Sequence, residues 1–349
     1  MAVLKIANLN AEWMVNFFDQ KNKKFWQGKS KSKGFGRKPN NVQVVAEKLA
    51  GVIKELEAEI IGIEEGPPTQ QLMELFVKEY LDNDYDVYSM PHGRQSIHAL
   101  VRKDLVGLKV EQMKGTHPIY RHIARGLEYY TWGEVKKSRI DKFTRKPVVL
   151  KVSKGDQSVE IFVYHTKSKI AKLKTKKQYT SKDREAMIDA LRSRQKLSAE
   201  MWSIRRYLSH AILSQRTDGI ILLGDLNDGP HRDVFEKHFL IHNIVDELRG
   251  GFHREKALMH HAFRDEFLEG KQAYTAQFRD PTQDGKRVKV MLDHILVTSS
   301  VKDKGAPLKL IKNSGVIEHE AYEKFLTNSG LKGDERPCDH RPVSARFKY

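Results

Sequence analysis

Short apolar runs recur along this chain, and each is followed within two residues by a polar or acidic residue. The run 219–223 is too short for a core helix and has apolar side chains on both faces, which is typical of a strand in the middle of a sheet. Residues 3–10 and 59–65 show the same pattern nearer the N-terminus. Strands of this kind predict a layered α/β core.

Helices and strands are mixed along the whole chain. Apolar spacing predicts helices over 40–57, with Pro39 and Asn40 as start signals, and over 70–80 and 183–213. Further strands are expected at 86–89, 97–102, 147–152 and 159–164, and a hairpin is expected to join 274–279 to 288–297 through Asp284-Gly285. Because no polar linker or internal repeat interrupts this order, we predict one domain over 1–349. It carries basic loops at 21–38 and 167–184 and an insertion at about 107–146.

Charge and cysteine usage narrow the class of protein. The 349 residues include 62 Lys and Arg against 45 Asp and Glu, which gives a formal charge of +17. Nucleic acid is the first candidate partner for such an excess, although a membrane surface or an acidic protein would suit the same sign. Cys338 is the single cysteine, which excludes an internal disulfide framework and a cysteine-based zinc cluster. With no apolar run long enough to span a membrane and no signal peptide, we expect a cytoplasmic protein without a membrane segment.

Polar residues stand at the downstream ends of the expected strands, where loops can hold a site above a rigid sheet. They are Asn10, Glu65, His165, Asp225, Asn227, Asp293, Asp339 and His340. Asp225 and Asn227 are two apart, so on a strand they would face the same way and form a base beside an orienting amide. Taken singly, each has a structural explanation as a turn, a cap or a solvated strand end.

The set in this order resembles the endonuclease/exonuclease/phosphatase superfamily, which has the DNase I-like fold. The motifs that carry the resemblance are Ile6-Ala7-Asn8-Leu9-Asn10, Ile60-Ile61-Gly62-Ile63-Glu64-Glu65, His165-Thr166-Lys167-Ser168, Gly224-Asp225-Leu226-Asn227-Asp228, Leu292-Asp293-His294-Ile295-Leu296-Val297 and Cys338-Asp339-His340-Arg341-Pro342-Val343. The resemblance implies a four-layer α/β sandwich with two packed mixed β-sheets flanked by helices. It also implies cleavage of phosphoester bonds with a divalent ion, Mg²⁺ or Mn²⁺.

The resemblance also implies a role for each residue. Glu65 and Asn10 match the metal-binding glutamate and the asparagine at the metal and phosphate, and Asp339 is similar to the acid that completes the metal environment. Asp225 matches the residue that orients or deprotonates the attacking water, and Asn227 matches the amide that helps to hold it. His340 matches the histidine at the scissile phosphate, and Asp293 matches its paired carboxylate. His165 matches a second histidine that binds phosphate or protonates the leaving group. Hard oxygen ligands suit Mg²⁺ in their own right.

Three residues depart from the family pattern. Glu64 stands where the family often has Gln, and it either serves a second ion or faces solvent. Cys338 replaces a common Ser, and we expect a small residue without a chemical role. Glu12 is a doubtful metal neighbour. We further expect the histidines His253, His260, His261 and His294 to be solvated surface residues rather than zinc ligands.

Charge selects among the substrates of such a fold, because the fold alone does not. The basic run 21–38 comes after Asn10, and the run 167–184 follows His165 directly. Lys167, Lys169, Lys172 and Lys174 are the expected nucleic-acid contacts. We predict a divalent-metal-dependent nuclease that hydrolyses phosphodiester bonds in nucleic acid, DNA rather than RNA, as an endonuclease or nickase. A phosphoesterase of the same fold acting on a small-molecule or lipid phosphate is the first alternative, and a non-catalytic nucleic-acid-binding protein is the second.

Overall fold

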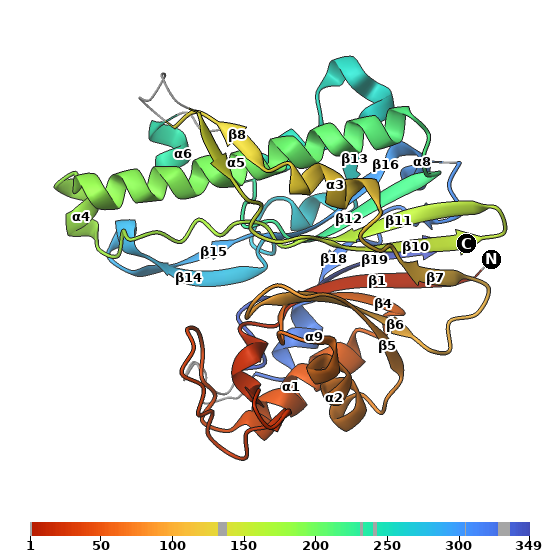
Figure 1. Ribbon diagram of the computed structural model, residues 1–349, viewed down its shortest axis with the longest axis horizontal. Coiled ribbons are helices and arrows are strands. Elements are labelled where there is room, and N and C mark those ends of the chain that lie inside the picture. The colour runs from red at the N-terminus through yellow and green to blue at the C-terminus, as the bar shows by residue number, and fades with distance from the viewer. Residues whose placement is uncertain (1, 132–137, 231–232, 240–242, 304, 327–335) are drawn as a thin grey trace.

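The computed structural model describes residues 2–131, 138–230, 233–239, 243–303, 305–326 and 336–349. Within these ranges the chain forms two large mixed β-sheets that lie face to face, with helices on the outer face of each (Figure 1). The layers follow the order helix, sheet, sheet, helix. The four-layer α/β sandwich predicted from the sequence is confirmed.

The first sheet has strand order β17-β19-β1-β4-β6-β5, with β18 beside β19. Its strands are β1 (Val3–Asn10), β4 (Ile60–Gly66), β5 (Tyr85–Met90), β6 (Ser96–Arg102), β17 (Lys309–Leu310), β18 (Val316–Ile317) and β19 (Val343–Lys348). β1 runs parallel to β4 and antiparallel to β19.

The second sheet has strand order β13-β16-β12-β11-β10-β7. Its strands are β7 (Lys109–Gln112), β10 (Val148–Lys154), β11 (Gln157–Val163), β12 (Gly219–Asp225), β13 (Met259–His261) and β16 (Asp293–Thr298). β11 runs parallel to β12, and β12 runs antiparallel to β16. Three small ribbons pair β2 (Phe18–Asp19) with β3 (Lys24–Phe25), β8 (Leu127–Tyr129) with β9 (Arg139–Asp141), and β14 (Ala276–Asp280) with β15 (Lys286–Val290).

Helices cover both outer faces. On the first sheet lie α1 (Val42–Glu55), α2 (Gln70–Tyr80) and α9 (His319–Glu323), and on the second lie α3 (Pro118–Ala124), α5 (Arg184–Leu213) and α7 (Ile244–Arg249) (Figure 1). The short helices α4 (Lys176–Thr180), α6 (Val234–His238) and α8 (Ser299–Lys302) and four 3₁₀ turns, Met14–Phe17, Phe252–Ala257, Asp265–Phe267 and Pro281–Gln283, complete the described elements. None of the described helices is long and apolar enough to cross a bilayer.

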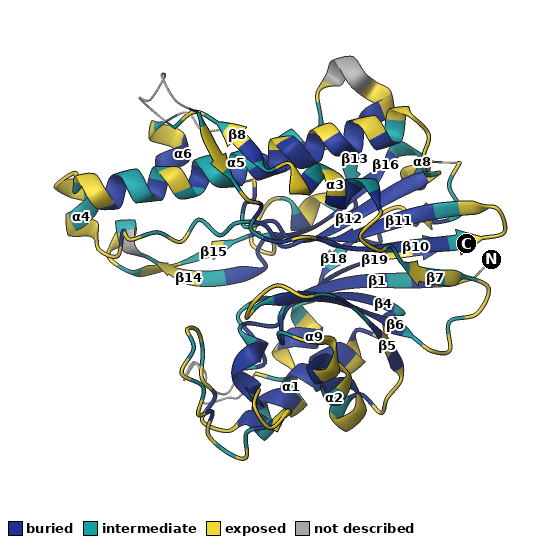
Figure 2. Cartoon of the chain, in the orientation of Figure 1, coloured by how far each residue is buried: buried dark blue, intermediate teal, exposed yellow. Residues whose placement is uncertain are grey.

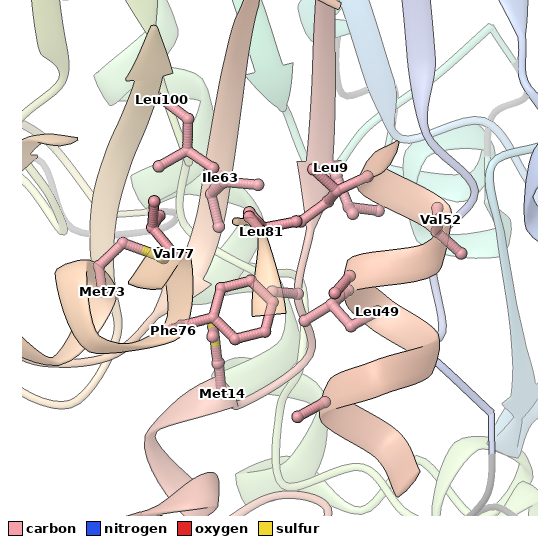
Figure 3. Close-up of a cluster of buried hydrophobic side chains, with 14 of the residues drawn as sticks. Leu9, Met14, Leu49, Val52, Ile63, Met73, Phe76, Val77, Leu81 and Leu100 are labelled. Atoms are coloured by element: carbon pink, nitrogen blue, oxygen red, sulfur yellow. The ribbon is translucent and has the colours of Figure 1, made fainter. Parts of the chain in front are cut away.

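Apolar packing holds the layers together. The inner faces of the two sheets share one buried cluster, to which Ile6 and Ile161 contribute from opposite sheets. A second cluster lies between the first sheet and helices α1 and α2, where Leu49 and Phe76 meet Leu9 (Figure 3). The central strands of the two large sheets are accordingly buried along most of their length (Figure 2). Each fully buried leucine or isoleucine stabilises the fold by about 1.5–3 kcal/mol relative to exposure.

Helix boundaries follow from capping side chains. The Asn41 side chain accepts a hydrogen bond from the Val44 backbone N–H, so α1 begins at Val42, two residues after the predicted start. Thr69 caps α2 and Asp183 caps α5, and these helices agree closely with the predicted ranges 70–80 and 183–213.

Two segments differ from the sequence expectation. The predicted insertion at 107–146 contributes β7 to the edge of the second sheet and α3 to its outer face, so much of it belongs to the framework; its residues 132–137 lie outside the described part. The expected hairpin is shorter, because the chain leaves β15 after Val290 and re-enters the main sheet as β16 beside β12. The single domain over 1–349 stays a prediction.

The topology brings several strand ends to one edge of the sandwich. β1, β4, β11 and β12 end there, whereas β16 and β19 begin there, because they run antiparallel to their neighbours. Asp293 is therefore the first residue of its strand and His340 precedes β19, so the expectation that these two follow a strand is wrong. The predicted catalytic and metal-binding residues nevertheless lie at or near this edge.

Candidate active site

Asp225 and Asn10 join the two sheets at this edge. Each is the last residue of its strand, and the Asn10 amide nitrogen donates to Asp225 Oδ2 at 2.9 Å. Asp225 is buried, and this burial raises the pKa of its carboxyl to about 6 despite the opposing effect of His340. A carboxylate with this pKa can accept a proton near neutral pH.

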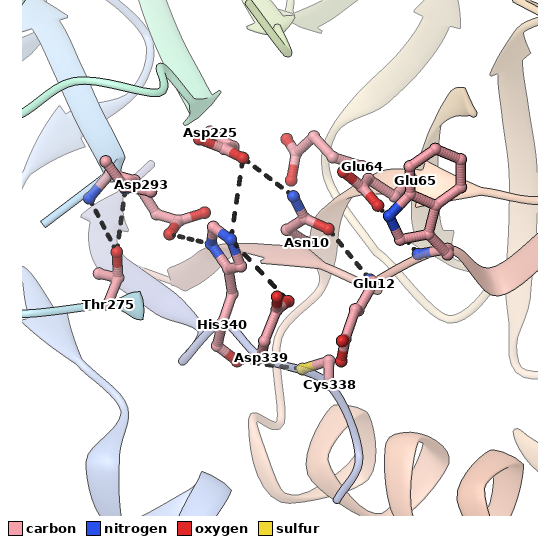
Figure 4. Close-up of polar contacts among 12 residues, drawn as sticks. Asn10, Glu12, Glu64, Glu65, Asp225, Thr275, Asp293, Cys338, Asp339 and His340 are labelled. Carbon is pink, nitrogen blue, oxygen red and sulfur yellow. Dashed lines mark hydrogen bonds and ion pairs between the residues drawn. The ribbon is translucent and has the colours of Figure 1, made fainter. Parts of the chain in front are cut away.

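His340 and Asp293 form a second pair beside Asp225. His340 Nδ1 lies 2.7 Å from Asp293 Oδ2, and His340 Nε2 lies 3.9 Å from Asp225 Oδ2 (Figure 4). Burial lowers the pKa of His340, but the adjacent carboxylates of Asp293 and Asp225 have the larger effect and raise this pKa well above its usual value. The site therefore holds an imidazolium whose Nε2 faces Asp225.

Glu65 reaches the site because the strand is irregular. The β4–β6 pairing shifts register between Ile63 and Gly66, and Glu65 has φ of 53°, in the left-handed region. Such a bulge re-aims a side chain. Glu65 Oε2 accepts a hydrogen bond from the Trp13 backbone N–H at 2.9 Å, and burial, with Asp339 and Asp225 nearby, raises its pKa to about 7.

His165 and Asn227 also lie beside Asp225. His165 Nε2 lies 3.5 Å from Asp225 Oδ2, and burial lowers the pKa of His165 well below its usual value, so this imidazole is neutral. The predicted strand geometry for Asn227 is wrong, because β12 ends at Asp225 and Asn227 has φ of 51°. Its backbone N–H donates to Asp225 Oδ1 at 2.8 Å, whereas its amide nitrogen lies 3.4 Å from the Thr166 carbonyl oxygen.

Comparison with known proteins was informative for solved structures. No protein-family model and no curated protein sequence matches the chain. TDP2 from Caenorhabditis elegans, as selenomethionine protein, is 14% identical over 100% of this chain and 75% of that chain, with a TM-score of 0.51. A truncated form of C. elegans TDP2 is 14% identical over 99% of this chain and 98% of that chain, with a TM-score of 0.50. An endonuclease/exonuclease/phosphatase from Bacteroides vulgatus is 12% identical over 100% and 99% of the two chains, with a TM-score of 0.47.

This chain has the endonuclease/exonuclease/phosphatase fold. The resemblance drawn from the sequence motifs is thereby confirmed at the level of the fold. Because the identities are so low, the roles of individual residues depend on the geometry of this site.

Glu65, Asp225 and Asp339 supply oxygen donors of the kind that a hard divalent cation takes. Burial raises the pKa of Glu65, and the neighbouring carboxylates of Asp339 and Asp225 raise it further, so negative charge is concentrated beside Glu65. Among the described residues, no group of three or more His, Cys, Asp and Glu side chains is arranged so that it could hold a metal ion. Mg²⁺ keeps several waters and uses one or two protein carboxylates, so it does not require three protein ligands.

Two acids near the site have other partners. Glu12 is bound by Arg336 and lies 3.4 Å from Arg37, so its charge is neutralised within the protein. Glu64 is fully buried and accepts a hydrogen bond from the Asn8 amide at 2.9 Å, so the expectation that it faces solvent is wrong. Burial, with Asp293 and Asp225 nearby, raises the pKa of Glu64 well above its usual value.

Three of the four additional histidines can be placed. His294 is fully buried and His261 half-buried, and they lie 3.0 Å apart, Nε2 of His261 to Nδ1 of His294. His294 Nε2 also contacts the Asp228 carbonyl oxygen at 2.7 Å. The prediction of a solvated surface residue is wrong for His294, which lies in the buried strand β16, and His261 is packed against it from the neighbouring strand β13. His260 is half-exposed, and the side chain of His253 lies outside the described part.

The four predicted nucleic-acid lysines differ in their surroundings. Lys169 is paired with the buried carboxylates of Asp228 and Glu236. Its ammonium group neutralises these two charges and is not free to contact a phosphate. Lys172 is exposed and paired with Glu185, and Lys174 is exposed. Lys167 is half-buried and donates to the Ser168 carbonyl oxygen at 2.5 Å. The expected contact at Lys169 is therefore wrong.

Arg145 is a site residue that the sequence reasoning missed. It is 8% exposed, and its guanidinium donates to the Thr166 carbonyl oxygen at 3.0 Å and to the Gln95 side chain. It acts on Glu65 and Asp225, since it lowers the pKa of Glu65. The sequence shows it two residues before an apolar strand, which does not distinguish a buried arginine from a solvated one. Its buried Nε has no hydrogen-bond partner among the described residues.

Proposed function

We propose that this protein is a divalent-metal-dependent nuclease that hydrolyses phosphodiester bonds in DNA as an endonuclease or nickase. The observation that carries the proposal is the convergence on one point at the edge of the sandwich of Asn10 and Asp225, from strands of opposite sheets, and His340, from the segment before β19 (Figure 4). Function rests on this site, because the fold hosts many phosphoester substrates.

Asp225 is the residue best placed to act on water. Its Oδ2 is held by Asn10 and its Oδ1 by the Asn227 backbone N–H, so the carboxylate is fixed in orientation. With a pKa of about 6 it is largely ionised at neutral pH yet basic enough to take a proton as water attacks phosphorus. Its conversion to an amide would remove the acceptor and keep the shape.

His340 supplies positive charge where negative charge develops. Asp293 holds Nδ1, so the protonated Nε2 is free to donate to a phosphoryl oxygen. The neutral His165 is suited to hydrogen bonding with the phosphate, whereas the protonated His340 is the better source of a proton for the leaving oxygen. Arg145 adds a buried cation on the side of Glu65.

Glu65, Asn10 and Asp339 are the residues that would hold a divalent ion. When bound, Mg²⁺ or Mn²⁺ would polarise the phosphoryl oxygen and stabilise charge on the leaving group. Asp339 is 35% exposed and 4.0 Å from His340 Nε2, so it is open to solvent and substrate. Arg145 remains as a fixed charge that limits repulsion among these acids.

The choice of DNA rests on charge. Lys21, Lys23 and Lys24 are exposed in the loop 21–38, and Lys172 and Lys174 are exposed in the loop after His165. A phosphate backbone is the ligand that such flanking cations favour, and its binding should weaken steeply with salt.

The test is a substrate panel. Wild-type protein is incubated with supercoiled plasmid, linear duplex, single-stranded DNA, RNA, an inositol phosphate and a phospholipid, each with Mg²⁺, Mn²⁺ or EDTA. We expect metal-dependent nicking of plasmid ahead of the other substrates. Hydrolysis of the inositol phosphate or phospholipid with no cleavage of nucleic acid would overturn the proposed DNA substrate. It would leave the proposed phosphoester hydrolysis intact. Binding of DNA without cleavage of any substrate would overturn the enzymatic proposal.

A further inference from the structure

The β14–β15 ribbon lies apart from both main sheets and carries a cationic face. Figure 1 shows it extending from the sandwich toward α4, beneath the N-terminal half of α5. Its register pairs Arg279 with Arg287 and Gln277 with Lys289. Because side chains alternate along a strand, Arg279, Arg287 and Lys289 share one face of the ribbon. All three are exposed.

These three cations have no carboxylate partner within the described part of the chain. The two acidic residues of the ribbon have other contacts: Asp280 caps the 3₁₀ turn through the Thr282 N–H, and Asp284 is paired with Lys176 of α4 at 2.6 Å. The positive charge of the face is therefore available to an external anion.

The base of the ribbon is joined to the catalytic residues. Ala276 forms a β-bridge with His340, and the Arg341 N–H donates to the Thr275 carbonyl oxygen at 2.6 Å. The Thr275 hydroxyl in turn accepts from the Asp293 N–H at 3.2 Å. At the far end, the Lys176–Asp284 ion pair ties the tip to α4. The base of the ribbon is thus held beside His340, and its tip contacts α4 through an exposed ion pair.

We propose that this cationic face binds the phosphate backbone of duplex DNA beside the cleavage site. The inference rests on the proposed nuclease function and adds the surface that selects a polymeric substrate. Arg279 lies three residues from the bridge to His340, about 10 Å at about 3.3 Å per residue. Each strand of a duplex carries one phosphate per about 3.4 Å of axis, so the contact falls about three base pairs from the scissile phosphate.

The test compares two triple variants of equal charge change. R279Q/R287Q/K289Q removes the cationic face, and K309Q/K312Q/K348Q removes three exposed lysines at the edge of the first sheet where β17 pairs with the C-terminal end of β19, away from His340. Binding of a fluorescent 20-base-pair duplex is measured in EDTA over a range of salt, and hydrolysis of bis(p-nitrophenyl) phosphate is measured with Mn²⁺.

The ribbon variant should bind the duplex at least tenfold more weakly than wild type at 0.1 M salt. The slope of log affinity against log salt should fall by about 2 to 3, since each phosphate contact contributes about 0.9. Its hydrolysis of the small diester should stay within twofold of wild type. The control variant should show a smaller loss of affinity and slope.

Equal losses of duplex affinity in the two variants would overturn the proposal. Binding to phosphatidylserine vesicles is measured for the same proteins. A ribbon variant that loses vesicle binding and keeps duplex binding would also overturn the proposal. Failure of the nuclease function is distinguishable. If wild type binds but does not cut DNA and the ribbon variant alone loses binding, the surface stands and the nuclease fails. If wild type hydrolyses the small diester and does not bind the duplex, both fail.

Discussion

Asp293→Asn removes one negative charge from its contact with His340 Nδ1, 2.7 Å away, and changes the shape of the side chain very little. A hydrogen bond to a charged group contributes about 1.5–3 kcal/mol, against about 0.5–1.5 kcal/mol for a neutral one. The difference of about 1–2 kcal/mol corresponds to a fall in kcat/KM of about 5- to 30-fold.

The pH profile gives an independent sign. Asp293 and Asp225 raise the pKa of His340, so the protonated form is present below that pKa and is lost as the pH rises through it. Loss of Asp293 lowers this pKa. The alkaline limb of kcat/KM for plasmid nicking should therefore move to lower pH in the variant.

The control is Asp156→Asn, at the exposed turn between β10 and β11, which makes the same chemical change far from His340. Thermal unfolding of both variants shows whether the fold is retained. A folded D293N protein with wild-type kcat/KM and an unmoved alkaline limb would refute the role assigned to His340.

Three further perturbations concern buried groups. Cys338→Ser should keep kcat/KM for plasmid nicking within about twofold of wild type, because burial raises the pKa of the thiol and a serine hydroxyl can make the same hydrogen bond to the His340 carbonyl oxygen. A large loss of activity would show that the thiol has a chemical role. Arg145→Gln should lower kcat/KM about tenfold or more and raise the Mg²⁺ concentration for half activity, since Arg145 lowers the pKa of Glu65; an unchanged Mg²⁺ titration would contradict this. Burial lowers the pKa of His98 to about 4, so the free energy of unfolding should keep the contribution of neutral His98 above pH 6.5. It should fall by up to about 1.4 kcal/mol per pH unit between about pH 6 and 4. If the urea midpoints of wild type and His98→Gln fall equally over this range, the role given to His98 is refuted.

The sequence predicted those parts of the fold that depend on local pattern. The strand over 3–10 and the helix over 70–80 agree with β1 and α2, because buried strands and capped amphipathic helices carry local signals. The break between β15 and β16 was missed, since Met291 and Leu292 continue the apolar pattern while the chain changes sheets.

The candidate site shows the same limit. The order of the motifs identified Asp225 and His340, and the structure places His340 Nε2 3.9 Å from Asp225 Oδ2. The sequence pattern could not show that Lys169 is paired with two buried carboxylates. It could not show that Arg145 is buried beside Glu65 either. Both depend on contacts between segments distant in sequence, and a lysine or arginine in a basic stretch looks solvated until its partners are known.

The measurement that tests the central claim most directly is the rate of nicking of supercoiled plasmid by wild type and Asp225→Asn, with Mg²⁺ and with EDTA. We predict nicking by wild type with Mg²⁺, none with EDTA, and a rate at least about 100-fold lower for the folded variant, because the carboxylate that accepts the proton of water is gone. Cleavage by wild type that survives EDTA, or an Asp225→Asn protein as active as its parent, would contradict a metal-dependent site centred on Asp225.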